Sequence, residues 1–86
     1  MKTFDYVIKD AVGIHARPAG FLVKAAKEYE SEVTLTKQPD KKADLKRYFE
    51  VMKLGVKCGD AITITATGAD EEQAIAAVEK VLVENL

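Results

Sequence analysis

The chain has few of the residues that mark several common classes of protein. It contains one cysteine, Cys58, so no disulfide can form within it, and a single reduced thiol fits a cytoplasmic protein. The 13 Lys and Arg residues do not outnumber the 14 Asp and Glu residues, which argues against a nucleic-acid-binding protein. No apolar run approaches the ~18 residues that a membrane-spanning helix needs. The first ten residues alternate and carry acids, so we expect neither a signal peptide nor a transit peptide.

The length of the chain limits the kind of site that it can hold. Its 86 residues, 48% of them apolar, predict one globular domain that spans residues 1–86. A domain of this size buries only roughly 60% of the surface of its unfolded chain, so a deep internal active site is not expected. The sequence also lacks a serine triad, a glycine-rich phosphate loop and a cluster of metal ligands. We therefore expect surface chemistry, with no metal and no cofactor.

The hydrophobic pattern predicts an α+β fold. Alternation predicts strands at residues 3–9, 32–37, 41–43 and 61–66, with a turn at 38–40. Helical spacing predicts helices at residues 16–28 and 45–54, and a last helix that Asp70 caps, with Gln73 completing a capping box. The order β-α-β-β-α-β-α indicates an open-faced two-layer sandwich, in which three helices cover one face of a four-stranded antiparallel sheet. Threonines are expected on the solvated face: Thr34, Thr36, Thr63 and Thr65.

One short stretch holds the only histidine of the chain and could support a reaction. It reads Gly13-Ile14-His15-Ala16-Arg17-Pro18-Ala19. A lone histidine is often a helix cap or a surface residue without chemical work. If the helix begins at Ala16, however, His15 is its N-cap, beside free backbone N–H groups and the positive end of the helix dipole. Arg17 can fold back towards the imidazole and add a full positive charge. These surroundings suit a dianion on the ring and disfavour the imidazolium form, which leaves a ring nitrogen free as a nucleophile.

The segment GIHARPAGFLVKAAKEY, with the later VMKLGVKCGD and GADEEQA, resembles the HPr family, the histidine-containing phosphocarriers of the bacterial phosphoenolpyruvate-dependent sugar phosphotransferase system. The resemblance covers essentially the whole chain. It implies a phosphoryl carrier, not an independent enzyme. Enzyme I would phosphorylate His15 on Nδ1, and the carrier would pass the phosphoryl group to a sugar-specific enzyme IIA. Arg17 would balance the phosphoryl charge, and Pro18 would fix the start of the helix.

The resemblance also implies a docking surface for these partners. Its expected residues are Ala16, Pro18, Lys24, Lys27, Tyr48, Phe49 and Met52. Met52 could also fill the core side of the second helix, and one aromatic, more readily Phe49, could pack inward. Arg47 stands where many relatives carry a serine that a regulatory kinase modifies, so we expect this chain to escape that kinase. We expect a monomer that binds no nucleic acid and does not insert into a membrane.

Two alternatives to the carrier remain at this point. The second helix differs from that of many relatives, with Arg47 in place of the serine. This difference is compatible with a regulatory module of the same fold, in which phosphorylation of His15 switches a partner protein. An unrelated small α+β binding domain, with His15 only a cap, is disfavoured by the intact GIHARP string.

Overall fold

The computed structural model describes residues 1–37 and 40–86, so the turn expected at Gln38 and Pro39 lies outside the described residues. The elements follow the predicted order. They are β1 (Lys2–Val7), α1 (Ala16–Lys27), β2 (Glu32–Lys37), β3 (Lys41–Asp44), α2 (Tyr48–Lys53), β4 (Ala61–Thr67) and α3 (Glu71–Asn85). No helix within these described ranges is long and apolar enough to cross a membrane.

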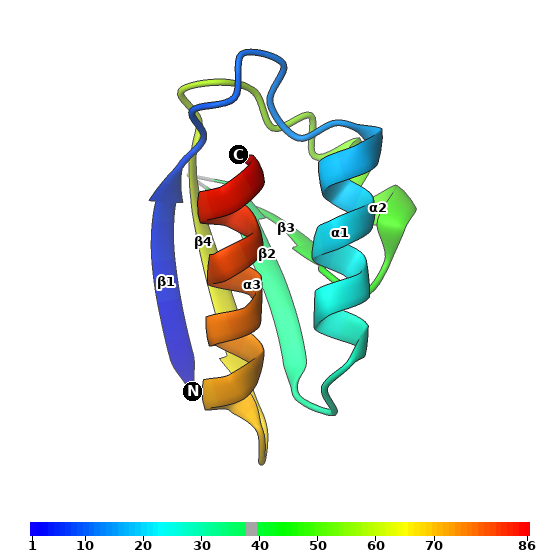
Figure 1. Cartoon of the computed structure of the whole chain (residues 1–86), viewed down its shortest axis with the longest axis vertical. Coiled ribbons are helices and arrows are strands. Elements are labelled where there is room, and N and C mark those ends of the chain that lie inside the picture. Colours follow the sequence, from blue (N-terminus) through cyan, green and yellow to red (C-terminus); the bar gives the residue numbers. More distant parts are fainter. Residues whose placement is uncertain (38–39) are drawn as a thin grey trace.

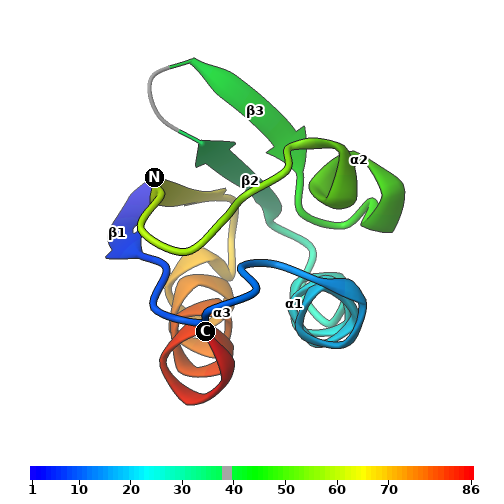
Figure 2. The ribbon, with the colours of Figure 1, turned by 90° about the horizontal axis from the view of Figure 1, so that it is seen from above.

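The sheet is antiparallel throughout and has the strand order β1-β4-β2-β3. α1 and α3 lie side by side against one of its faces, and α2 lies beside β3 (Figures 1 and 2). Ile64 of β4 stands opposite Phe4 of β1 and Leu35 of β2, and these three side chains face the helices. The next residue pairs present the expected threonines on the other face, where they are half-buried. The predicted open-faced sandwich is therefore confirmed.

The first helix forms where its apolar spacing predicts it. Ala19, Leu22, Val23 and Ala26 recur at helical spacing, and all four are buried in the hydrophobic core. Pro18 lies in the first turn, where its missing N–H removes no hydrogen bond. Pro18 and the apolar residues that follow it thus account for a helix that begins close to Ala16.

The second helix is shorter than the sequence indicates. It begins at Tyr48, not at residue 45, because the chain first completes the sheet and turns. The Leu45 N–H donates to the Val33 carbonyl at 2.9 Å, which prolongs the pairing with β2. The Asp44 side chain and carbonyl then accept the N–H groups of Lys46 and Arg47 at 2.9 and 3.0 Å. Leu45 is fully buried all the same, so the expected core contact is kept without the helix.

The predicted capping box at the start of α3 is wrong. Asp70 occupies the N-cap position, but its side chain makes no capping bond. Its carboxylate accepts the N–H groups of Glu30 and Ser31 and the hydroxyl of Ser31 instead. The Ser31 hydroxyl contributes most to lowering the pKa of the Asp70 carboxyl below its ordinary value. Asp70 therefore ties the loop after α1 to the loop before α3.

Candidate functional site

The loop that carries His15 is held by backbone hydrogen bonds to two remote segments. Figure 1 shows the β1–α1 loop, the α2–β4 loop and the end of α3 together at one end of the molecule. Ile14 N–H donates to the Val56 carbonyl at 3.0 Å, and Gly59 N–H donates to the Ile8 carbonyl at 2.8 Å. The N–H groups of Lys9 and Asp10 both donate to the Leu86 carbonyl, at 2.7 and 2.9 Å. The loop is thus fixed from both sides before it reaches His15.

Gly13 allows the closest of these approaches. Its φ of +83° lies in the left-handed region that glycine adopts at little cost. A Cβ atom built at this position would lie 2.4 Å from the Val56 carbonyl oxygen and 2.6 Å from the Cα of Lys57. Because both neighbours are backbone atoms, they cannot rotate away. Gly13 therefore lets the loop pack directly on the α2–β4 loop.

His15 is the N-cap of α1, in an extended conformation with φ −123° and ψ −176°. Its carbonyl accepts the Ala19 N–H at 2.9 Å, which begins the helical hydrogen-bond pattern. No hydrogen bond joins the ring to the first turn. The side chain is 42% exposed, so the imidazole lies at the surface beside the N–H groups of that turn. The imidazole therefore lies at the positive end of a helix, and its role as a nucleophile stays a prediction.

Asp10 is a neighbour of the imidazole that sequence reasoning missed. Its Oδ1 lies 4.0 Å from the Nε2 of His15 and accepts the Val12 N–H at 2.9 Å. The two residues are brought together by the folded loop, which has no periodic pattern. The only local signal is an acid placed before a glycine-containing turn, and such a residue usually serves the turn alone.

Arg17 is exposed, and its contact in this structure runs along α1. The Cζ atom of its guanidinium lies 5.8 Å from the ring centroid of Phe21, one turn further on. The expected approach of this guanidinium to the imidazole stays a prediction. Of the other residues expected around it, Ala16 is exposed, whereas Pro18 is buried and supports the first turn.

The two aromatics of α2 lie near the His15 end of α1 but play different parts. The Tyr48 hydroxyl donates to the Ala16 carbonyl at 3.5 Å, and the Tyr48 ring is half-buried against the core. Phe49 meets it edge to face at 5.5 Å between ring centroids and is 77% exposed. The alternative that Phe49 packs inward is therefore wrong. Met52 is half-buried and packs on the core, so it offers only part of its side chain to the surface.

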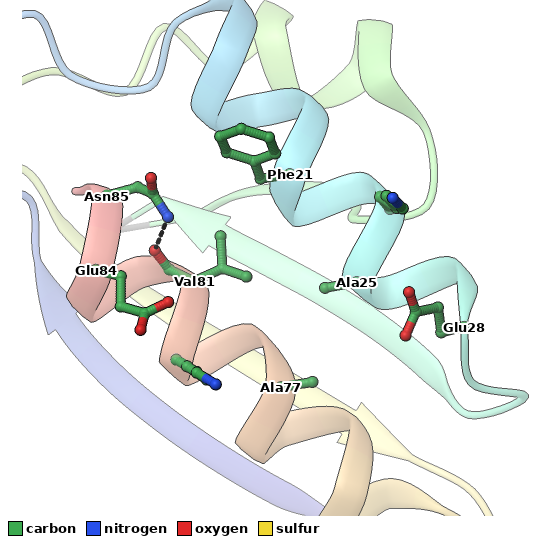
Figure 3. A pocket seen from close by; sticks show the side chains of 9 residues that line it. Phe21, Ala25, Glu28, Ala77, Val81, Glu84 and Asn85 are labelled. Carbon is green, nitrogen blue, oxygen red and sulfur yellow. Dashed lines mark hydrogen bonds between the residues drawn. The ribbon is translucent and has the colours of Figure 1, made fainter.

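The two lysines of α1 are both exposed, but they line different hollows. Lys27 borders a pocket of about 450 Å³ with residues of α2 and the preceding turn, Phe49 among them. Lys24 borders a groove of about 400 Å³ between α1 and α3. Figure 3 shows Phe21 and Ala25 of α1 facing Val81 of α3 across this groove. The expected docking residues therefore divide over the two sides of α1.

Arg47 precedes α2 and is 71% exposed. Its Nε lies 3.7 Å from a carboxylate oxygen of Asp44 and 3.5 Å from one of Glu50. These two acids offset the positive charge that the sequence places at the start of α2.

Cys58 is exposed, and its thiol contacts the Lys9 carbonyl at 3.8 Å. Within residues 1–37 and 40–86, no group of three or more His, Cys, Asp or Glu side chains could hold a metal ion.

Comparisons with known proteins agree on one family. The family model described as "PTS HPr component phosphorylation site" matches residues 2–84. The chain is 46% identical over 85 residues to the phosphocarrier protein HPr of Mycoplasma genitalium, and the alignment covers 99% of this chain and 97% of the relative. It is 43% identical over 82 residues to the phosphocarrier protein HPr of Mycoplasma pneumoniae, with 95% and 93% covered.

Solved structures give the same result for the fold. A histidine-containing phosphocarrier protein from a study of Mycoplasma superposes with a TM-score of 0.93 at 38% identity, covering 96% of this chain and 93% of that one. HPr from Thermoanaerobacter tengcongensis gives a TM-score of 0.91 at 36% identity, with 98% and 93% covered.

Proposed function

The chain belongs to the HPr family of phosphocarrier proteins of the phosphotransferase system, and we propose that it accepts a phosphoryl group from enzyme I on His15 and passes it to a sugar-specific enzyme IIA. A protein of this family carries a phosphoryl group and is not an independent catalyst. The observation that supports the proposal is the half-exposed imidazole at the start of α1, in a loop fixed by backbone hydrogen bonds.

The proposed reaction consists of two displacements at phosphorus, one onto His15 and one from His15 to enzyme IIA. The lone pair of His15 Nδ1 forms a bond to phosphorus, and the bond from phosphorus to the donor breaks with its electron pair left on the donor. The proton on Nε2 stays in place. In the second step the acceptor on enzyme IIA forms a bond to phosphorus, and the Nδ1–P electron pair returns to the imidazole. The three phosphoryl oxygens stay with phosphorus throughout.

The start of α1 would stabilise the phosphoryl charge. The first backbone N–H groups of a helix have no partner within the helix and carry partial positive charge. In α1 these groups lie beside His15, and Pro18 contributes none. We expect the Arg17 guanidinium to leave Phe21 and bind two phosphoryl oxygens, a geometry that a lysine cannot copy. The interactions of both groups strengthen as the negatively charged phosphoryl group arrives at Nδ1.

The surface around the ring would dock the larger partners. On the α2 side, Tyr48 and Phe49 form an aromatic pair, and the Tyr48 hydroxyl contacts Ala16. Lys27 borders the same hollow as this pair, and Met52 of α2 offers part of its side chain to the surface. Lys24 extends this surface on the other side of α1. Exposed aromatics are frequent centres of binding energy at interfaces. Because Asp44 and Glu50 offset the charge of Arg47, we expect apolar contact more than charge to dominate at α2.

The test is a phosphoryl-transfer assay with purified enzyme I and phosphoenolpyruvate. The wild type should gain the mass of one phosphoryl group, and acid should remove it. His15→Ala is the matched control. An N-cap substitution costs about 0.5–2 kcal/mol, and here we expect the low end because the ring makes no capping bond. A folded His15→Ala variant that still gained acid-labile phosphate would refute the assignment.

Adding enzyme IIA to the phosphorylated protein tests the second half. Loss of the phosphate to enzyme IIA is the expected result. Phosphorylation by enzyme I without passage to any enzyme IIA would refute the carrier role and favour a regulatory module.

A further inference from the structure

We propose that Asp10 is a positioning residue for the transfer reaction, which sets the nitrogen of His15 that carries the proton. The proposal rests on the proposed function, since it concerns the same imidazole. Asp10 Oδ1 lies 4.0 Å from His15 Nε2, the ring nitrogen that does not receive the phosphoryl group. Asp10 would hold the proton there and leave the lone pair on Nδ1.

The position of the carboxylate does not depend on the imidazole. The Asp10 N–H donates to the Leu86 carbonyl at 2.9 Å, and the Asp10 carbonyl accepts the Gly13 N–H at 3.0 Å. The Val12 N–H then donates to Oδ1 at 2.9 Å. Three hydrogen bonds thus fix both the backbone and the side chain, which is 30% exposed. A carboxylate held in this way can orient the ring, not merely follow it.

The tautomer follows from the chemistry of the two groups. A carboxylate only accepts hydrogen bonds, and a neutral imidazole has one nitrogen that donates and one that accepts. The favourable pairing puts the imidazole proton on Nε2, towards Asp10, which leaves Nδ1 as the nucleophile. At 4.0 Å the two atoms are too far apart for a direct hydrogen bond. A bridging water or a small rotation of the half-exposed ring closes this distance, as reactive contacts often do only when a reaction partner binds.

Asp10 has a second part to play after transfer. Once Nδ1 bears phosphorus and Nε2 bears its proton, the ring carries a positive charge. The Asp10 carboxylate faces the Nε2 side of that ring, while the start of α1 and Arg17 face the phosphoryl group. Positive and negative surroundings are thus matched to the two ends of phosphohistidine.

Asp10→Asn separates this role from support of the loop. The asparagine Oδ1 can still accept the Val12 N–H, so the loop is kept while the charge is lost. Asp5→Asn is the matched control, because Asp5 also accepts one hydrogen bond, from Thr63 at 2.7 Å, and lies exposed on the opposite face of the sheet.

The experiment is a two-bond ¹H–¹⁵N correlation spectrum of the His15 ring, recorded where the imidazole is neutral, together with the rate of phosphorylation by enzyme I. The wild type and Asp5→Asn should show the proton mainly on Nε2. Asp10→Asn should move population to the Nδ1-protonated form and slow phosphorylation by about tenfold, the low end of the loss seen when residues that orient metal-binding histidines are replaced.

An unchanged tautomer ratio in Asp10→Asn would overturn the proposal, even if phosphorylation became slower. The ring spectrum needs no enzyme I. A wild type that enzyme I fails to phosphorylate would refute the proposed function, while the tautomer ratio would still test Asp10.

Discussion

Replacing Gly13 with alanine should destabilise the protein more than any backbone preference alone explains. The left-handed conformation, φ +83°, costs a residue with a Cβ about 1–2 kcal/mol. The new Cβ would also lie 2.4 Å from the Val56 carbonyl oxygen, and relieving such overlap costs about 1–3 kcal/mol. The sum is about 2–5 kcal/mol. The free energy of unfolding of a domain this size is only about 4–13 kcal/mol.

Gly59→Ala provides the matched control. Gly59 has φ +89°, so the conformational cost is similar, but nothing lies within 4 Å of its added Cβ. This variant should lose only about 1–2 kcal/mol. Urea denaturation measures both losses, and the slope of the transition should not change. The melting temperature should fall by roughly 4–8 °C for each kcal/mol.

The difference between the two variants measures the close approach of the loops. Equal losses in Gly13→Ala and Gly59→Ala would refute the argument. We also expect folded Gly13→Ala to be phosphorylated more slowly than folded Gly59→Ala, since relief of the overlap must move the loop that carries the imidazole.

The remaining predictions concern function and acid stability. Arg17→Lys should slow phosphorylation markedly with little change in melting temperature, because the side chain is exposed; equal rates would remove it from the mechanism. Phe49→Ala should weaken binding to enzyme I by about 2 kcal/mol or more in calorimetry while stability stays the same, because the ring is 77% exposed. The Ser31 hydroxyl lowers the pKa of the Asp70 carboxyl below its ordinary value of 3.8. The ionised Asp70 therefore stabilises the folded protein at pH values above 3.8, and this stabilisation is lost as the pH falls through the lowered pKa. The melting temperature should therefore decrease less between neutral and acid pH for Asp70→Asn than for the wild type. Because Arg47 has no hydroxyl, treatment with an HPr kinase and ATP should leave no acid-stable phosphate on α2, and such a phosphate in the mass spectrum would contradict this.

The sequence predicts most of the fold because the hydrophobic periodicity within each segment is enough to identify most of the helices and strands. Ile62 and Ile64 alternate with threonines in β4, and Leu22 and Ala26 recur at helical spacing in α1. The start of α2 was missed because Leu45 is apolar and buried in either conformation. The hydrogen bond from Leu45 to Val33 that keeps it outside the helix joins residues that are distant in the sequence.

The site was predictable only in part for the same reason. The His15 stretch is a local motif, and its place at the start of α1 follows from Pro18 and the apolar spacing. The role of Asp70 depends on a loop about forty residues away, so the pattern Asp70 to Gln73 suggested a cap that does not form. Asp10 comes close to the imidazole only through the backbone bonds that shape the loop.

The use of backbone atoms to hold the loop has a consequence for how the surface can change in evolution or by design. At the His15 end most of the fixing contacts run between backbone N–H and carbonyl groups, which nearly every residue type supplies, and the side chains of Asp10 and Asp60 add one contact each. The side chains of Lys9, Ala11, Val12 and Lys57 point to the outside and are exposed. Substitutions at these positions can therefore alter charge and shape at this end of the molecule without removing the backbone contacts that hold the loop. The loop that carries His15 can therefore accept substitutions at its exposed positions, where a new partner would contact the protein. It resists substitution at Gly13, where no side chain fits.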